Sequence, residues 1–346
     1  MKKKAKNIET SAATVYDGNS FLDIRDLEVY YTSGGHIVQA VNGVNLTLNE
    51  GETLGLVGET GAGKTTIAKS ILRILPDPPA KIKAGEIWLD GENLLAKSER
   101  DMQHIRGNKV AMIFQDPMTA LNPTMTVGNQ ISEVVALHNP EMSKRDVMER
   151  TNEMLELVGI PRTRYVEYPH QFSGGMKQRV VIAMALACDP KLLLADEPTT
   201  ALDVTIQAQV LDMMRNLKDK LGTSMILITH DLGVVCETCD KVAVIYAGQI
   251  VESGVKAHIF KNASHPYTKG LFASLPNLHD ELPEEGHKRL APIPGLPPDP
   301  TNLPAGCPFS PRCPHACEAC CEGVMPDVEI EPGHIVKCIK FAKEGN

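Results

Sequence analysis

The chain has 346 residues, of which 42% are hydrophobic and 23% are charged, values typical of a globular protein with about two domains. Asp and Glu outnumber Lys and Arg, 43 to 35, and this acidic balance argues against nucleic-acid binding through a basic face. No apolar run approaches the roughly 18 residues of a membrane span, and no secretion signal follows the basic start. We therefore expect a chain that neither spans a membrane nor is exported, with its nine cysteines in a reducing compartment.

Residues 1–20 are polar, and we expect them to form a flexible leader. Between Leu22 and Leu48, short apolar alternations are interrupted by glycine-containing turns, a pattern typical of antiparallel strands in a small β subdomain. Five later runs are apolar throughout and suit parallel strands that are buried on both faces. They are residues 53–57, 110–114, 192–195, 225–229 and 242–246. The expected fold is therefore α/β with a parallel-sheet core.

A separate helical subdomain is expected at about residues 126–180, between the second and third of these runs. Ser143 followed by Asp146 forms an N-cap signal, and Gly159 ahead of Pro161 ends the helix that begins there. This insertion would stand apart from the sheet.

The composition changes near the C-terminus. Of the 24 prolines, 13 lie from Pro276 to Pro332, and six of the nine cysteines lie in the last forty residues. Because such a segment is poor in periodic apolar runs, we expect an appendage with little regular structure that is folded by something other than a large core.

Residues 58–65 match the phosphate-binding loop pattern of Gly, four residues, and Gly-Lys-Ser/Thr. They follow an apolar run and precede a helical one, which is the context that the pattern requires. In such loops backbone N–H groups wrap a polyphosphate, while Lys64 would supply positive charge and Thr65 a Mg²⁺ ligand. A chance glycine-rich turn is the alternative. The predicted nucleotide-binding residues of this segment are Gly58, Glu59, Thr60, Gly61, Ala62, Gly63, Lys64, Thr65 and Thr66.

Polar side chains also follow three of the predicted strands. Asp196 and Glu197 come directly after one strand, Gln115 follows a second and His230 a third. Asp196 could hold Mg²⁺ through water, and Glu197 could orient or deprotonate an attacking water. Read singly, these are ordinary loop or capping residues, but their common place at the carboxyl edge of a parallel sheet favours one shared site.

The segment Ser173, Gly174 and Gly175 precedes an apolar helical run. Its backbone N–H groups could face an anion, or Ser173 could cap the helix in the ordinary way. The residues alone leave both interpretations open.

These segments, in this order and spacing, closely resemble the ATP-hydrolysing subunits of ABC transporters over nearly all of residues 21–340. The resemblance implies a P-loop NTPase fold, with a nucleotide-binding domain at residues 21–275 and an oligopeptide-transporter-type domain at residues 276–346. It also implies ATP and Mg²⁺ as cofactors, with hydrolysis to ADP and phosphate.

The resemblance gives each segment a role. Residues 58–65 resemble the Walker A loop, residues 172–176 the signature loop, and Tyr31 the aromatic that stacks on adenine. The other assignments are Gln115 as the Q-loop glutamine, Asp196 and Glu197 as the Walker B pair, residues 201–203 with Asp203 as the D-loop, and His230 as the switch histidine. Glu197, His230 and Gln115 are thereby the expected catalytic residues, and Thr65, Gln115 and Asp196 the expected Mg²⁺ ligands.

The family also implies partners. Its signature loop completes the ATP site of a second subunit, so Ser173, Gly174 and Gly175 should serve a partner's ATP. That partner would be a paralogue or a second copy of this chain in an ATP-sandwich dimer. The assembly should include two transmembrane permease subunits, and the helical insertion should be the surface coupled to a permease, which places the chain at the cytoplasmic face of the membrane. No nucleic-acid partner is expected.

Further segments suggest the subfamily. Residues 265–268 (HPYT), 293–295 (IPG), 307–309 (CPF) and 311–313 (PRC) are similar to those of dipeptide/oligopeptide and nickel importers. We therefore expect an ATPase that drives peptide import, with an extracytoplasmic peptide-binding protein as an indirect partner. A nickel importer, a soluble ABC ATPase not tied to transport and an iron–sulfur sensor remain alternatives.

The subfamily resemblance aligns four cysteines, Cys307, Cys313, Cys320 and Cys338, separated by 5, 6 and 17 residues. Four thiolates can hold a [4Fe–4S] cluster or a tetrahedral Zn²⁺, and unligated thiols are the third alternative. Only Cys317 and Cys320 show the close pairing common in zinc sites, which favours the cluster. Cys317 and Cys321 have no assigned role, and Cys236 and Cys239 are expected to pack in the core.

Overall fold

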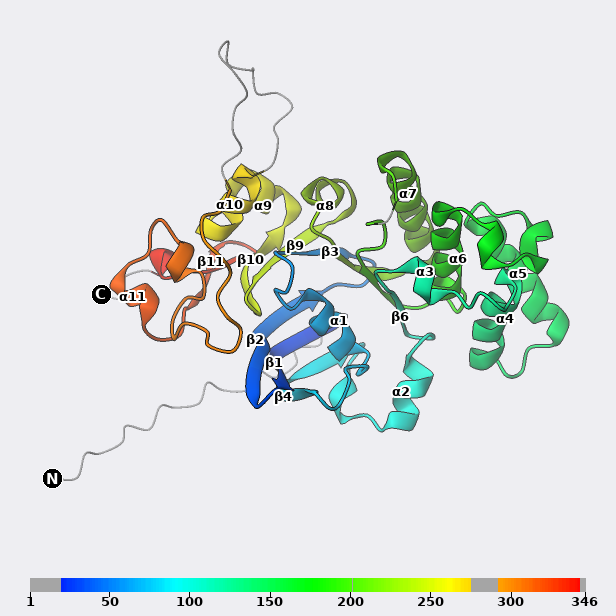
Figure 1. The fold of residues 1–346 in the computed structure, drawn as a ribbon, viewed down its shortest axis with the longest axis horizontal. Helices are drawn as coiled ribbons and strands as arrows, with labels where there is room; N and C mark the ends of the chain where they lie inside the picture. The colour runs from blue at the N-terminus through cyan, green and yellow to red at the C-terminus, as the bar shows by residue number, and fades with distance from the viewer. Residues whose placement is uncertain (1–19, 201, 275–291, 343–346) are drawn as a thin grey trace, which may run out of the picture.

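The computed structural model describes residues 20–200, 202–274 and 292–342. The predicted leader, except Ser20, lies outside the described residues. Figure 1 shows an elongated molecule, with the helical subdomain at one end, the C-terminal region at the other and two sheets between them.

The smaller sheet is the predicted antiparallel β subdomain. Its strands are β1 (Leu22–Ser33), β2 (His36–Leu48), β4 (Ala80–Leu89) and β5 (Glu92–Asn93), in the order β2-β1-β4-β5. From Leu27 to Tyr30, residues of β1 alternate between buried and partly exposed positions, because one face of the sheet covers a core and the other faces solvent. The sequence between Leu22 and Leu48 predicted its first two strands.

The larger sheet contains the five predicted parallel strands, each within one residue of its expected ends. They are β3 (Thr53–Val57), β6 (Val110–Ile113), β7 (Leu192–Asp196), β8 (Ser224–Ile228) and β9 (Lys241–Tyr246), in the spatial order β9-β3-β8-β7-β6. Antiparallel strands extend this sheet beyond β9, and composition did not predict them. They are β10 (Gln249–Val255), β12 (His334–Lys337) and β11 (Asp327–Glu331).

The parallel strands are buried on both faces because two cores lie against them. In β7, Leu192 and Leu194 face the core shared with the β subdomain and α1 (Lys64–Ile71). Leu193 and Ala195 face the second core, which includes α6, α7 and α8. These helices span Gly174–Leu186, Val204–Leu221 and Leu232–Thr238. This double burial explains the uninterrupted apolar runs.

The helical subdomain contains α3 (Pro117–Ala120), α4 (Val127–His138), α5 (Lys144–Leu157) and α6. The Ser143 hydroxyl accepts the backbone N–H of Asp146 at the start of α5, as predicted. Helix α5 ends at Leu157, and Gly159 follows with a φ of 76°, a left-handed conformation that glycine adopts without strain. Helix α2 (Glu99–Ile105) lies outside this subdomain, beside the smaller sheet (Figure 1).

The C-terminal region packs against α9 (Lys256–Asn262), α10 (Pro266–Ala273) and the antiparallel edge of the larger sheet. It contains α11 (Glu318–Cys321) and the β11–β12 hairpin, and is therefore more regular than its composition predicted. Phe309 is its largest fully buried side chain and contacts the rings of Tyr246 and Tyr267.

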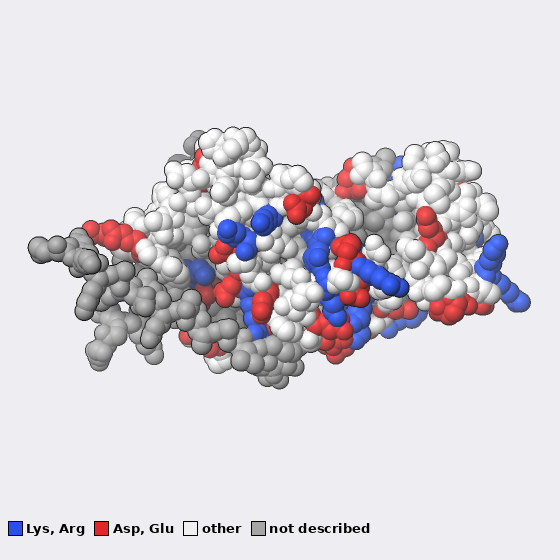
Figure 2. Space-filling model, turned by 90° about the horizontal axis from the view of Figure 1, so that it is seen from below, with Lys and Arg blue, Asp and Glu red and all other residues white. Residues whose placement is uncertain are grey.

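Among the described residues, no helix combines the length and apolar character needed to cross a bilayer. Figure 2 shows Lys and Arg side chains interspersed with Asp and Glu near the middle of one face. Such a mixture gives neither sign of charge a continuous field over that face.

Candidate functional site

The phosphate loop, residues 58–65, connects β3 to the start of α1. Its backbone requires glycine at two positions. A Cβ atom on Gly58 would collide with the carbonyl oxygen of Ile245, and one on Gly63, whose φ is 104°, with that of Ala40. Because Gly63 caps α1, the free N–H groups and positive dipole end of the helix lie beside the loop, an arrangement that binds phosphate.

Lys64 lies inside this loop, with its side chain buried. Its Nζ atom donates to the carbonyl oxygens of Gly58 at 2.7 Å and Glu59 at 3.0 Å. Burial lowers the pKa of Lys64, while the negative charges of Glu197 and Asp196 act in the opposite direction. The ammonium group is thus held among acceptors in the place where this loop type receives phosphate.

Asp196 and Thr65 form the oxygen-rich part of the site. Asp196 is the last residue of β7 and is 4% exposed. Burial and the charge of Glu197 raise its pKa above the usual value, although a hydrogen bond with the Thr65 side chain partly offsets this shift. A hydroxyl and a carboxylate are the hard oxygen donors that Mg²⁺ prefers. Two of the three predicted Mg²⁺ ligands therefore lie together and fit the ion.

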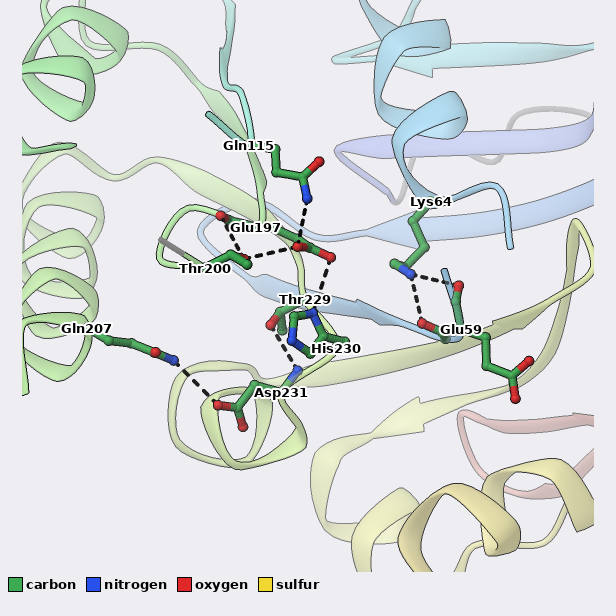
Figure 3. A network of polar contacts seen from close by, with 10 residues as sticks. Glu59, Lys64, Gln115, Glu197, Thr200, Gln207, Thr229, His230 and Asp231 are labelled. Atoms are coloured by element: carbon green, nitrogen blue, oxygen red, sulfur yellow. Dashed lines mark hydrogen bonds and ion pairs between the residues drawn. The ribbon is translucent and has the colours of Figure 1, made fainter. Parts of the chain in front are cut away.

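Glu197 lies at the centre of a polar network (Figure 3). Its carboxylate accepts hydrogen bonds from Gln115 Nε2 at 3.1 Å and Thr200 Oγ1 at 3.0 Å, and it lies 3.3 Å from His230 Nδ1. Burial alone would raise the pKa of Glu197, but the contacts with His230 and Thr200 and the charge of Lys64 lower it below its usual value. The group is therefore a carboxylate at neutral pH, able to accept a proton from water or to orient it.

The backbone of Glu197 is also unusual, because its φ is 47°, a left-handed conformation that is rare for residues other than glycine. Strain of this kind is often found at functional sites. The sequence predicted Glu197, Gln115 and His230 at one sheet edge, and the structure brings all three together. Thr200 was missed, although its position three residues after Glu197 was a usable signal.

A second set of contacts holds the segment that carries His230. Asp231 caps α8 through Gly233 N–H, and its own N–H donates to Thr229 Oγ1 at 3.0 Å. Gln207 Nε2 of α7 reaches Asp231 at 3.4 Å. The histidine therefore projects from a segment fixed on both sides (Figure 3).

Three other predicted residues lie outside this network. The Tyr31 hydroxyl lies 3.4 Å from Thr66 Oγ1, beside the phosphate loop. Ser173 caps α6 by accepting the N–H of Met176, and Asp203 caps α7 by accepting that of Ile206. The capping alternative for Ser173 is therefore correct locally, and both capping side chains are exposed. Ala201 lies outside the described residues.

The C-terminal region contacts the phosphate loop through a nearly buried arginine. Arg312 Nη1 lies 3.1 and 3.0 Å from the two carboxylate oxygens of Glu59, and 3.1 Å from the Tyr246 hydroxyl. The Tyr267 hydroxyl accepts the backbone N–H of Glu59 at 3.0 Å. Sequence reasoning used Arg312 and Tyr267 only as subfamily markers and missed these contacts.

The four aligned cysteines line one cavity of about 380 Å³, together with Cys317. The aligned residues are Cys307, Cys313, Cys320 and Cys338. The cysteines of the described chain are free thiols, and Cys317 Sγ lies 3.3 Å from Cys320 Sγ. Burial raises the pKa of Cys307 to about 11 and also raises that of Cys338. Cys307 and Cys338 are therefore protonated thiols at neutral pH in this structure.

Cys236 and Cys239, which follow His230 in the chain, differ in burial. Cys239 is buried beside Gly55, as predicted, and burial raises its pKa to about 12. Cys236 is exposed, so the prediction that it packs in the core is wrong. Cys236 lies on the outer face of α8, whose buried residues are Leu232, Val234 and Val235, so its side chain faces solvent.

Comparisons with known proteins agree with this geometry. Residues 41–200 match the ABC transporter family, and residues 251–320 match the C-terminal region of oligopeptide/dipeptide transporters. The oligopeptide transport ATP-binding protein OppD of Bacillus subtilis (strain 168) is 52% identical over 318 residues, which cover 91% of this chain and 87% of OppD. The dipeptide transport ATP-binding protein DppD of the same strain is 49% identical over 320 residues, which cover 92% of this chain and 93% of DppD.

A solved structure extends the comparison to the fold. The dimeric structure of a post-hydrolysis state of the ATP-binding cassette MJ0796, bound to ADP and Pi, matches with a TM-score of 0.61 and 26% identity. The match covers 68% of this chain and 98% of that one.

Proposed function

This chain belongs to the ABC transporter family, and from that membership and the geometry of the sheet edge we propose that it is the ATP-hydrolysing subunit of a peptide importer. The observation that carries this proposal is the network around Glu197. Gln115 and His230 both reach its carboxylate, beside the Asp196–Thr65 pair and the phosphate loop. That arrangement suits the displacement of a phosphoryl group by water.

Each part of the site has a distinct task. The N-terminus of α1 and Lys64 bind the phosphates and neutralise their charge. Thr65 and Asp196 would hold Mg²⁺, which supplies positive charge to the transferring phosphoryl group. Glu197 orients water and accepts its proton, Gln115 holds that carboxylate in place, and His230 would contact the γ-phosphate.

We assign the complete ATP site to two subunits. Ser173 and the N–H groups of Gly174 and Gly175 are exposed or partly exposed at the start of α6, where they can face a partner's ATP. The dimeric ATP-binding cassette MJ0796 supports this assignment. The partner is a paralogue or a second copy of this chain.

An apolar groove next to Gln115 is the proposed docking surface for one of the two transmembrane permease subunits. The groove has a volume of about 800 Å³ and lies between the sheet and the helical subdomain. Its lining includes Phe114 and Leu137, which are 44% and 74% exposed. A permease segment seated there would sense changes at Gln115, one residue away from Phe114, and would keep the chain at the cytoplasmic face of the membrane.

The substrate class follows from the C-terminal match and the relatives' names. We propose nucleotide binding for residues 21–275 and a separate oligopeptide-transporter-type domain for residues 276–346. Peptide would reach the permeases from an extracytoplasmic binding protein. A nickel importer and an ABC ATPase not tied to transport are the alternatives.

The function can be tested by reconstituting the chain with its permeases and binding protein in lipid vesicles. Di- or oligopeptide should stimulate phosphate release and enter the vesicles only when ATP is present. Stimulation by Ni²⁺ alone would favour the nickel importer. ATP hydrolysis that ignores the permeases would contradict the transport proposal.

We also propose a [4Fe–4S] cluster in the cysteine cavity. Cys307, Cys313, Cys320 and Cys338 supply the four thiolates that such a cluster needs. Their separations of 5, 6 and 17 residues lack the close pairing common in zinc sites, which favours the cluster over Zn²⁺.

The cluster can be tested by purifying the chain without oxygen and assaying iron and acid-labile sulfide, with about four of each expected. Because a cluster binds thiolates, protons compete with it for the cysteines, and iron uptake should fall as the pH is lowered. One equivalent of zinc without sulfide would replace the cluster by a structural zinc site.

A further inference from the structure

Two histidines and a glutamate meet where the C-terminal hairpin packs against α9. His258 belongs to α9, Glu331 ends β11 and His334 begins β12. Each offers one ligand atom, and these three atoms lie within 4.8 Å of one another. The cluster lies outside both the phosphate loop and the cysteine cavity, so neither the nucleotide nor the cysteine chemistry explains it.

His334 is fully buried and is oriented by a buried carboxylate. Its Nε2 atom lies 2.8 Å from Glu252 Oε1, and both side chains are 0% exposed. Glu252 also accepts the backbone N–H groups of Ser264 and His265. Because a carboxylate held in this way is an acceptor, the proton lies on His334 Nε2. In that tautomer the lone pair of the ring is on Nδ1.

That Nδ1 atom of His334 is buried and has no hydrogen-bond partner among the described residues. The Nδ1 atom of His258 is likewise buried and unpaired within the described chain. It lies 3.7 Å from Glu331 Oε2, too far for a hydrogen bond. The two rings stack with their centroids 5.9 Å apart. Buried polar atoms normally find partners, so two unpaired nitrogens beside one carboxylate point to a ligand.

We propose that His258, His334 and Glu331 bind a first-row divalent metal ion, for which Zn²⁺ is the best fit. Two imidazoles and one carboxylate form a known zinc donor set that leaves a fourth position for water. The contact between Glu252 and His334 is the outer-shell arrangement typical of metal-binding histidines. Mg²⁺ and Ca²⁺ prefer oxygen ligands throughout and should not compete.

The distances allow the ion to bind with small side-chain movements. Ligand atoms about 2.0–2.2 Å from a tetrahedral ion lie about 3.4 Å from one another. The pair formed by His258 and Glu331 is already at 3.7 Å. Their side chains are 34% and 46% exposed, so both can rotate while the buried His334 stays fixed.

The ion would fasten the hairpin to the rest of the protein. Strand β12 pairs with β10 at only two positions, Glu252 with Val336 and Ser253 with Ile335. A metal ion bound by His258 of α9 and by Glu331 and His334 of the hairpin would add a cross-link beside this short contact. Binding should therefore stabilise the C-terminal region rather than change the nucleotide site.

Zn²⁺ could enter the cysteine cavity as well as the proposed site, so its binding alone would not identify the site. Co²⁺ is the better probe because its spectrum depends on its ligands. Co²⁺ held by nitrogen and oxygen gives weak visible bands, whereas thiolate ligands add a strong near-ultraviolet charge-transfer band. We expect the full chain to bind one Co²⁺ without that sulfur band, and excess Mg²⁺ not to displace it. A titration in which every equivalent of bound Co²⁺ adds to the sulfur band would overturn the site.

Glu331→Gln and His258→Gln should weaken this Co²⁺ binding by at least about a hundredfold, since outer-shell changes alone weaken it about 10- to 100-fold. His104→Gln, at another exposed histidine, is the matched control and should bind like the wild type. Zn²⁺ should raise the unfolding temperature of the wild type and the control more than that of Glu331→Gln. Equal cobalt affinity in Glu331→Gln and the wild type, with both folded by circular dichroism, would refute the proposal.

Discussion

The nucleotide site and the C-terminal region hold their functional side chains by different means. At the nucleotide site, parallel strands end at one edge, and Gln115, Glu197 and His230 meet there as a result of sheet geometry. The C-terminal region from residue 292 contributes few residues to the core, with Cys307, Phe309 and Met325 its buried members. A sheet positions catalytic groups by itself, whereas a small, proline-rich region needs cross-links and contacts with its neighbour.

The largest effect on ATP turnover should come from Glu197, at the carboxyl edge of the larger sheet. Glu197→Gln keeps the side-chain size and removes the charge, so ATP turnover in the assembled transporter should fall by about 10²- to 10⁴-fold. ATP binding should persist, because Lys64 and the loop are unchanged. Wild-type turnover in this variant would show that another group activates the water.

The phosphate loop should respond in affinity rather than in turnover alone. Lys64→Ala removes a buried ammonium group, and ATP affinity should fall by about 10²-fold or more, since hydrogen bonds to charged groups contribute about 1.5–3 kcal/mol each. Lys81→Ala, at an exposed position on β4, is the control. Equal affinities of the two variants, measured by equilibrium titration, would remove Lys64 from the site.

The adenine contact is tested by Tyr31→Ala, which should weaken ATP binding by about 1–3 kcal/mol if the ring stacks on the base. Tyr31→Phe should change little, because the ring is kept and only the hydroxyl near Thr66 is lost. If Tyr31→Ala binds ATP normally, the stacking residue lies elsewhere, and Tyr30 is the next to replace.

The smallest effect on ATP affinity should come from the contact between the C-terminal region and the phosphate loop. Arg312→Ala breaks the contact with Glu59 and should lower ATP affinity several-fold, because the loop loses one brace and not a phosphate ligand. Arg215→Ala, at an exposed ion pair, should leave the affinity unchanged. A loss as large as that of Lys64→Ala would mean that the C-terminal region is part of the nucleotide site.

The difference between the nucleotide site and the C-terminal region also determines which features the sequence could predict. The parallel strands and the side chains at their ends were predictable, because double burial leaves uninterrupted apolar runs and parallel strands share one carboxyl edge. The β11–β12 hairpin was missed, although Val328 and Ile330 alternate with acidic residues ahead of a Pro332-Gly333 turn signal. Only its pairing with distant β10 has no local signal. The contact between Arg312 and Glu59 joins residues far apart in sequence, so local patterns carry no signal for it.

The most direct test measures bound ATP and phosphate release side by side in Glu197→Gln and in Cys338→Ser, each within the assembled transporter. We predict that Glu197→Gln retains ATP and releases almost no phosphate, while Cys338→Ser loses its metal but still binds ATP and releases phosphate. The reverse result, with rapid release by Glu197→Gln or loss of ATP binding in Cys338→Ser, would contradict the placement of hydrolysis at the sheet edge.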